Sequence, residues 1–167
     1  MIRKKNKFSW PRKLYDKTRI SDENKLVEEY GLKNKREIWK AEAKIKYFRN
    51  RAKFLITSSD DEKNQFFNKL KVMGLEVNTI ADVLALNKED LLKRRLSTIV
   101  WKKGLANTAR QARQFIVHKK VLVRDRAVNI PSYIVSTDIE GEITIKNKKQ
   151  ESLNEKDKWR NSYWKRS

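Results

Sequence analysis

Apolar residues recur at helical spacing through the first half of the chain. The clearest pattern has gaps of three or four residues between its members, which are Ile38, Ala41, Ile45, Phe48, Ala52 and Leu55. This spacing places them on one side of a helix and predicts a long amphipathic helix with a single buried face. Asn34 is the candidate cap of this helix, and Glu37 stands three residues later, as a capping box requires.

Four shorter helices are predicted around the long one. The first has Ser21 as its candidate N-cap and Gly31 as its stop. Another occupies about 60–74, and two short ones follow within 79–93. The last of these either continues unbroken into the next segment or bends near Arg94.

The pattern changes beyond Arg94. Two short helices are predicted on either side of Gly104, and a hairpin is predicted around Arg124-Asp125-Arg126. The predicted strands share short apolar runs bounded by charged or turn residues, at 120–123, 127–130, 134–135 and 142–145.

These elements predict an α+β fold, in which an N-terminal α-helical domain precedes a helix-helix-β-hairpin module with short additional strands and extended basic termini. The helical domain is expected to abut the module, without a long linker between them. The predicted boundaries are 1–20 for a basic N-terminal arm, 21–93 for the helical domain, 94–145 for the module and 146–167 for a polar C-terminal tail.

The charge balance of the chain indicates a polyanionic partner. The 167 residues include 41 Lys and Arg against 21 Asp and Glu, a net charge of +20. Between Arg94 and Pro131 ten residues are basic and only Asp125 is acidic, and a compact fold with so much unpaired charge needs a polyanion. No apolar run approaches the roughly 18 residues that span a bilayer, so a nucleic acid is favoured over a membrane.

The side chains needed for catalysis or metal binding are scarce. The chain has no cysteine, which excludes disulfides, thiol catalysis and thiolate zinc sites. Its one histidine, His118, has no carboxylate near it in sequence to orient it as a base. The acids at 60–62 are explained by a helix N-terminus. We therefore predict no catalytic residue, no metal ligand and no cofactor.

The breadth of the basic surface favours folded RNA over DNA. Cations continue from the module onto the N-terminal helices, whereas a helix-turn-helix reads DNA with one recognition helix. The candidate contacts in the module are Arg94, Arg95, Lys102, Lys103, Asn107, Thr108, Arg110, Arg113, Gln114, His118, Lys119, Lys120, Arg124 and Arg126. The long helix adds Lys35, Arg36, Lys40, Lys44 and Arg49, since its exposed faces are almost entirely positive.

Aromatic residues among the cations have two interpretations. Trp39 and Tyr47 on the long helix are either core residues or stacking residues. The aromatics of the arm at 1–20 either belong to a solvated segment or stack on RNA, which we favour. Those near the end of the chain, Trp159, Tyr163 and Trp164, indicate docking on a partner.

Two segments of the sequence resemble a known family. RRLSTIVWKKGLANTARQARQFIVHKKVLV, followed by VNIPSYIVS, resembles the S-four RNA-binding domain. Upstream, EYGLKNKREIWKAEAKI is similar to the N-terminal part of the small-subunit ribosomal protein S-four family in its archaeal and eukaryotic branch, called S-nine in eukaryotic naming. The resemblance covers roughly 21–145. One departure is the hairpin turn, where Arg124-Asp125 replaces the family's common Asn-Gly and leaves the turn type open.

The resemblance implies a structural, non-enzymatic constituent of the small ribosomal subunit. It implies direct binding to a helical junction in the 5′ domain of small-subunit rRNA, nucleation of assembly, and a place near the mRNA entry channel beside neighbouring ribosomal proteins. A cytoplasmic location on the ribosome follows, with assembly in the nucleolus in a eukaryote, and neither a membrane nor a homo-oligomer is expected. By matching positions, the implied RNA contacts are Arg95, Lys102, Arg110, Arg113, Gln114, His118 and Lys119.

Two alternatives use the same kind of module. Pseudouridine synthases and tyrosyl-tRNA synthetases carry it, but they need a large catalytic domain for which 167 residues leave no room. A non-ribosomal stress factor would use it on stalled large-subunit complexes, but such a factor is not expected to share the KNKREIWKAEA helix.

Overall fold

The structure is a computed structural model, and it describes residues 6–146. The elements of its helical half are α1 (Lys17–Glu29), α2 (Arg36–Leu55), α3 (Asp60–Val72), α4 (Ile80–Ala85) and α5 (Lys88–Lys93). Those of the second half are α6 (Leu96–Lys102), α7 (Ala109–Val117), β1 (Val121–Val123), β2 (Arg126–Ala127), the 3-10 helix η1 (Thr137–Glu142) and β3 (Ile143–Ile145). The predicted α+β class is confirmed, since helices predominate and the strands form one antiparallel sheet.

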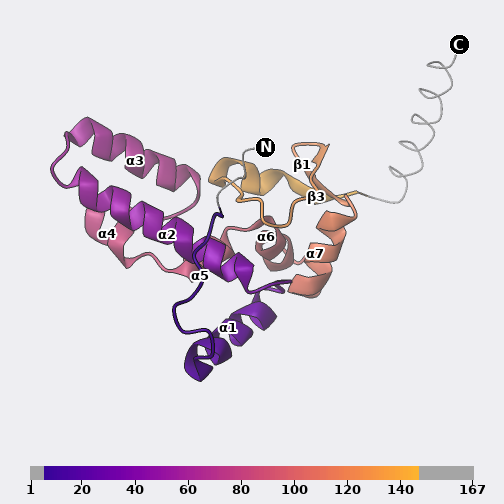
Figure 1. The fold of residues 1–167 in the computed structure, drawn as a ribbon. Coiled ribbons are helices and arrows are strands. Elements are labelled where there is room, and N and C mark those ends of the chain that lie inside the picture. The colour runs from indigo at the N-terminus through magenta and orange to yellow at the C-terminus, as the bar shows by residue number, and fades with distance from the viewer. Residues whose placement is uncertain (1–5, 147–167) are drawn as a thin grey trace, which may run out of the picture.

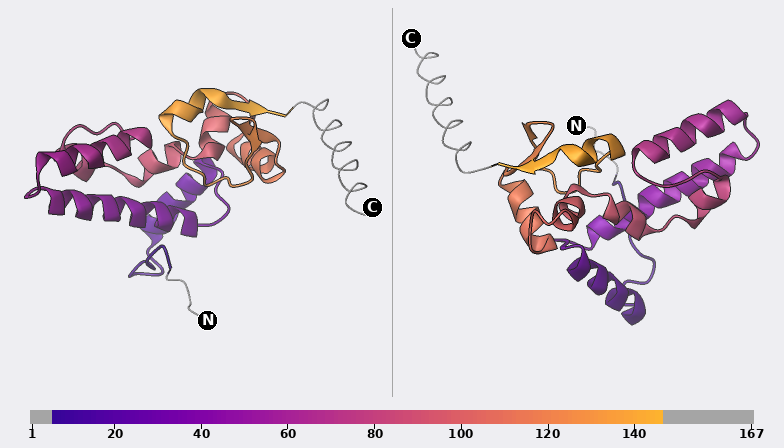
Figure 2. Two further views of the ribbon diagram at one scale, coloured as in Figure 1. Left: turned by 90° about the horizontal axis from the view of Figure 1, so that it is seen from above. Right: turned by 180° about the vertical axis from the view of Figure 1, so that it is seen from behind.

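Helices α2, α3 and α4 form one end of the molecule, and α6, α7 and the strands form the other end (Figures 1 and 2). We call the three-helix end the arm from here on, and refer to the basic N-terminal segment as residues 1–20. The predicted apolar face of α2 is confirmed, because all six of its residues are buried. It packs against Leu70 of α3, Val83 of α4 and Leu92 of α5, while Leu26 of α1 and its C-cap Tyr30 join the same cluster. Burial of this one continuous face holds five helices together.

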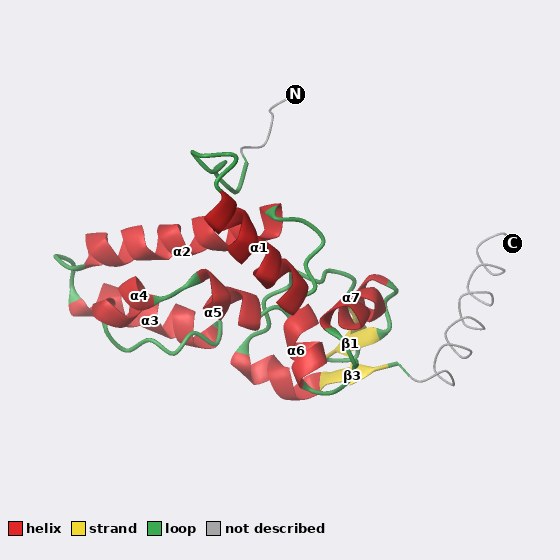
Figure 3. Cartoon of the chain, turned by 90° about the horizontal axis from the view of Figure 1, so that it is seen from below, coloured by secondary structure: helices red, strands yellow, loops and turns green. Residues whose placement is uncertain are grey.

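A second hydrophobic cluster lies inside the module. Ala112 and Ile116 of α7 are fully buried and pack against Val100 of α6 and Val121 of β1. The strands lie beside α7 at the end of the molecule opposite the arm (Figure 3). Alanines on the inner side of α7 allow α6 to approach closely.

The sheet has the order β2-β1-β3, with β1 in the centre. The predicted hairpin is confirmed, and Val123 pairs with Arg126 across a two-residue turn. Both turn residues have positive φ, 49° at Arg124 and 60° at Asp125, which is the conformation of a type I′ turn. The turn therefore keeps the geometry that Asn-Gly favours, with residues that adopt it less readily.

Several predicted boundaries were wrong. Helix α1 begins four residues before Ser21 because Asp16 caps it, accepting a hydrogen bond of 3.2 Å from the Thr18 amide. The stretch 127–130 leaves the sheet after Ala127. The predicted strand at 134–135 is reduced to one bridge between Ile134 and Arg95. Longer pairing is not possible, because the segment that contains Arg95 continues directly into α6.

The junction between α5 and α6 bends at Arg94 and Arg95, one of the two predicted outcomes. Arg95 has an extended backbone, with φ −73° and ψ 144°, and serves as the N-cap of α6. The helical half also touches the module through Gly31, whose φ is +58°. A Cβ at Gly31 would lie 2.8 Å from the backbone at the start of α7, so glycine is required there for both conformation and space.

Candidate nucleic-acid interface

One carboxylate joins the helical half to the module. Glu37, in the first turn of α2, accepts hydrogen bonds from two arginines of the module, Arg95 and Arg113. The Arg113 guanidinium binds it in a bidentate manner, with Nη2–Oε1 at 2.9 Å and Nη1–Oε2 at 3.2 Å. We call these three residues the Glu37 seam.

The capping box predicted at Asn34 and Glu37 was wrong. Asn34 does accept a hydrogen bond from the Arg36 amide at 3.0 Å, but the Glu37 side chain turns instead toward the module. Three charge-assisted bonds from two guanidinium groups outweigh a single bond to a backbone amide.

The Glu37 seam is largely buried and keeps a positive charge. Burial raises the pKa of Glu37, but the hydrogen bonds and charges of Arg113 and Arg95 outweigh it and hold the pKa below the ordinary 4.5. Arg95 is only 5% exposed. Because two guanidinium groups share one carboxylate, the seam keeps a net charge of +1.

A cavity of about 370 Å³ opens beside the seam. Lys40 and Lys44 of α2 line it from the helical half, and Pro131 and Ser132 line it from the module. Lys44 is half-buried, and burial lowers its pKa. In residues 6–146 its ammonium forms no ion pair, and the one carboxylate that lines the cavity, Glu37, is engaged by Arg95 and Arg113.

Helix α7 presents a polar outer face to solvent. Arg110, Gln114, Val117 and His118 are exposed, and their spacing of four, three and one places them on one side of the helix. We call these four residues the α7 face. Thr108 caps the helix by accepting a 3.1 Å hydrogen bond from the Gln111 amide, and the first turn contains no acid. The N-terminus of α7 therefore adds a positive dipole end to the same region.

Other predicted residues extend this surface. The exposed predicted residues without an ion pair to any carboxylate of residues 6–146 are Arg36, Lys40, Lys102, Asn107, Thr108, Arg110, Gln114, His118, Lys119, Lys120 and Arg126. Lys119 has φ +57° as the chain leaves α7. The Asn107 amide donates to the Gln111 side chain at 2.8 Å, so this loop is fixed by internal bonds.

The remaining predicted residues are engaged within the protein. Arg94 pairs with Glu140 at 2.8 Å, and its side chain is 16% exposed. Arg124 pairs with Glu142 at 2.8 Å. The other internal contacts are Arg49 with the Leu86 carbonyl at 2.6 Å, Lys35 with Glu23 at 3.7 Å, and Lys103 with the Glu140 carbonyl.

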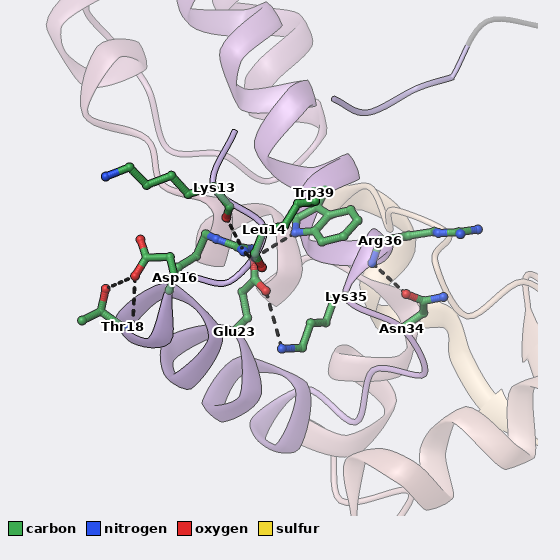
Figure 4. A network of polar contacts seen from close by, with 10 residues as sticks. Lys13, Leu14, Asp16, Thr18, Glu23, Asn34, Lys35, Arg36 and Trp39 are labelled. Atoms are coloured by element: carbon green, nitrogen blue, oxygen red, sulfur yellow. Dashed lines mark hydrogen bonds and ion pairs between the residues drawn. The ribbon is translucent and has the colours of Figure 1, made fainter. Parts of the chain in front are cut away.

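Sequence reasoning missed a second buried carboxylate. Glu23 of α1 is 3% exposed, accepts a 2.9 Å hydrogen bond from the Trp39 indole and pairs with Arg19 at 2.7 Å (Figure 4). Arg19 also donates to the carbonyls of Lys13 and Leu14, which ties down the segment before α1. The signal was present in the sequence, because Glu23 lies three residues before buried Leu26 on the same side of α1.

The two aromatic residues left open on α2 have different surroundings. Trp39 is partly buried and packs against Phe8 and Trp10, with ring centroids 5.9 and 5.3 Å away. Arg36 lies over Trp10 at 5.4 Å. Tyr47, by contrast, is 64% exposed. The core interpretation therefore applies to Trp39 and not to Tyr47.

The described residues offer little for metal or membrane binding. Within 6–146, no three His, Cys, Asp or Glu side chains are grouped as a metal site would require. In the same range every helix is too short or too polar to cross a membrane. The aromatic residues of the tail, from 159 onward, lie outside the described residues.

Comparison with known proteins agrees with this architecture. Residues 94–138 match the family model described as the S4 domain. Small ribosomal subunit protein uS4 from Saccharolobus islandicus is 45% identical over 146 residues, which cover 82% of this chain and 81% of that protein. The same protein from Picrophilus torridus is 43% identical over 150 residues, 84% of this chain and 81% of that one. The one from Methanococcus aeolicus is 49% identical over 124 residues, 70% of each. Since these matches include the helical half as well as the S4 domain, the chain belongs to the small ribosomal subunit protein uS4 family.

Proposed function

We propose that this chain is a structural constituent of the small ribosomal subunit and binds small-subunit rRNA directly. The observation that carries the proposal is the α7 face with its neighbouring lysines, a basic surface without paired carboxylates on an S4 domain. The names of the relatives support the ribosomal assignment. In this role the protein contributes binding and placement, and no catalytic step is assigned to it.

Binding would rest mainly on phosphate contacts. Arg110, His118 and Lys119 would reach phosphates, and the N-terminus of α7 would add its free amides. Gln114 supplies a donor and an acceptor for sugar or base edges. Since every neutralised phosphate releases counterions, affinity should fall steeply with salt.

The seam arginines have a different part in this proposal. Arg95 and Arg113 hold α2 against the module through Glu37, so that Lys40 and Lys44 stand beside the module's own cations. Their contribution to RNA binding is therefore mostly to positioning. The residual positive charge of the seam also favours a phosphate at the cavity.

The finer assignments follow from the family resemblance. We propose that the rRNA target is a helical junction of the 5′ domain, that binding nucleates assembly of this domain, and that the protein lies near the mRNA entry channel among other small-subunit proteins. The two hydrophobic clusters support treating 21–93 and 94–145 as the folding units. The corresponding location is the cytoplasm.

Sedimentation of the native protein tests this proposal. In a sucrose gradient of a lysate, the chain should travel with small subunits and resist moderate salt. Recovery with free large subunits would instead support the stress-factor alternative. A matched pair of variants tests the face: Arg110→Ala with Lys119→Ala should weaken filter binding to 5′-domain rRNA, and Lys63→Ala on α3 should not. Equal losses for the two proteins would refute the assignment of the face.

A further inference from the structure

The flank of α2 carries a line of three cations and two aromatic rings that the S4 domain does not account for. Its members, which we call the α2 stripe, are Lys40, Lys44, Tyr47, Arg51 and Phe54. Steps of four, three, four and three residues place them in one line along the helix, beside the buried face. The stripe begins at the cavity next to the Glu37 seam and runs toward the far end of the arm.

The two aromatic rings of the stripe are largely exposed to solvent. Tyr47 is 64% exposed and Phe54 is 66% exposed. Two large rings seven residues apart on one helix face form a repeated feature, whereas a single exposed ring would need no explanation. Each residue of a helix rises about 1.5 Å, so the two rings are offset by roughly 10 Å along the axis.

Arg51 lies between the two rings of the stripe, and two of its cations stand against aromatic rings of α2. The Arg51 guanidinium lies 5.5 Å from the centre of the Phe54 ring, and the Lys44 ammonium lies 5.7 Å from that of Phe48. None of the five stripe residues forms an ion pair with a carboxylate of residues 6–146. A hollow beside Tyr47 and Arg51 includes one acid, Glu62 of α3, and one further cation, Lys69. Cations therefore outnumber acids along the stripe, since Glu37 at the cavity and Glu62 in the hollow face Lys40, Lys44, Arg51 and Lys69.

We propose that the α2 stripe binds a short unpaired segment of RNA. Its bases would stack on Tyr47 and Phe54, and its phosphates would lie on Lys40, Lys44 and Arg51. Rings that take any base, next to cations that take the backbone, form the usual surface for single strands. A duplex keeps its bases stacked on each other, so it would contact the cations of the stripe without stacking on Tyr47 or Phe54.

Charge distinguishes this occupant from a protein. A protein helix seated on exposed rings would be expected to meet a largely neutral centre with charges at the rim. In the stripe, Arg51 stands between the two rings, and Lys44 is half-buried and forms no ion pair in residues 6–146. A polyanion with flat aromatic groups satisfies both parts of the pattern, and unpaired RNA has both.

This inference rests on the proposed RNA-binding function. The experiment that tests it uses the full chain and labelled RNA. The probes are single-stranded oligouridine and a duplex of the same length, measured by fluorescence anisotropy at several salt concentrations. Tyr47→Ala with Phe54→Ala removes both rings. Ile56→Ala with Val72→Ala is the matched control, since these side chains are 56% and 49% exposed and lie outside the stripe. Unfolding curves check that both variants remain folded.

The ring variant should bind oligouridine about tenfold or more weakly, because stacking on each ring is lost. Its affinity for the duplex and the salt dependence of its binding should stay unchanged, since no charge is removed. Lys40→Ala with Lys44→Ala should instead lower the salt slope by about two. Ultraviolet cross-linking of oligouridine to the natural chain should yield adducts on Tyr47 or Phe54.

An oligouridine affinity within about twofold of the natural chain would overturn the proposal. So would a ring variant that binds RNA normally but fails to retain another small-subunit protein on reconstitution, because the stripe would then be a protein contact. These outcomes leave the α7 face untouched, since binding of 5′-domain rRNA is measured with Arg110→Ala and Lys119→Ala. Failure of the α7 variants with an intact stripe effect would refute only the proposed rRNA surface.

Discussion

The Glu37 seam and the α7 face contain arginines from the same short helix, but the two regions use them differently. Arg113 points inward from α7 to Glu37 of α2 and is 22% exposed at its side chain. Arg110, three residues earlier, is exposed and makes no ion pair within residues 6–146. One turn of helix thus separates a cation that fixes the relation between the two halves from a cation that remains available. Position on the helix, and not residue type, decides which role an arginine takes.

The largest expected effect comes from breaking the seam. Glu37→Gln keeps the size of the side chain but leaves two part-buried guanidinium groups without a charge partner. We expect the free energy of unfolding to fall by about 3 kcal/mol, measured by urea denaturation. Glu76→Gln is the control, since Glu76 is exposed and forms no ion pair in the described range. A loss below about 1 kcal/mol would mean that the two halves dock independently of this carboxylate.

Removing charge from the α7 face should separate binding from stability. Arg110→Ala with Lys119→Ala should weaken binding to 5′-domain rRNA by about tenfold and lower the salt slope by about two, because two phosphate contacts are lost. Its urea midpoint should match that of the natural chain. Arg95→Ala is the contrasting variant, since it removes a residue of the seam and should lower the urea midpoint. A variant of the face that unfolds early would remove the distinction between the regions.

Acid should weaken the seam before it affects the face. The pKa of Glu37 is lowered in the folded state, so its contribution is complete above the unfolded value of 4.5 and is lost as the pH falls through the folded value. The difference in stability between the natural chain and Glu37→Gln should therefore shrink as the pH falls below about 4.5. Urea denaturation from pH 6 down to about pH 3 measures this difference. A constant difference across that range would rule out titration of Glu37.

The smallest effect is expected at the hairpin. Replacing Arg124-Asp125 with Asn-Gly should raise stability by about 1 kcal/mol, because both positions have positive φ. The exposed pair with Glu142 would be lost, and such pairs contribute little. Thermal unfolding measures the gain, and Arg126→Ala beside the turn is the control. The affinity for rRNA should change little, since Arg124 is paired with Glu142. A large loss of affinity would mean that Arg124 contacts the RNA.

The sequence predicted features that depend on local patterns. The buried face of α2 followed from its spacing, and the two short helices predicted within 79–93 are α4 and α5. The predicted role of Glu37 was wrong. Its spacing from Asn34 indicated a capping box, whereas the residues that it binds lie 58 and 76 positions away in the sequence. A single sequence gives no register for such distant pairs. Counting cations likewise located the basic region without indicating that Arg95 would be buried.

The shared carboxylate has a consequence for protein engineering. A module cut from this chain and fused to a foreign host would bring Arg95 and Arg113 without the acid that neutralises them. The graft would place two like charges side by side at the new junction and would repel the host surface. A donor fragment that starts upstream of Gly31 carries its own counter-charge and its own close contact with α7. The transplantable unit is therefore longer than the recognised domain.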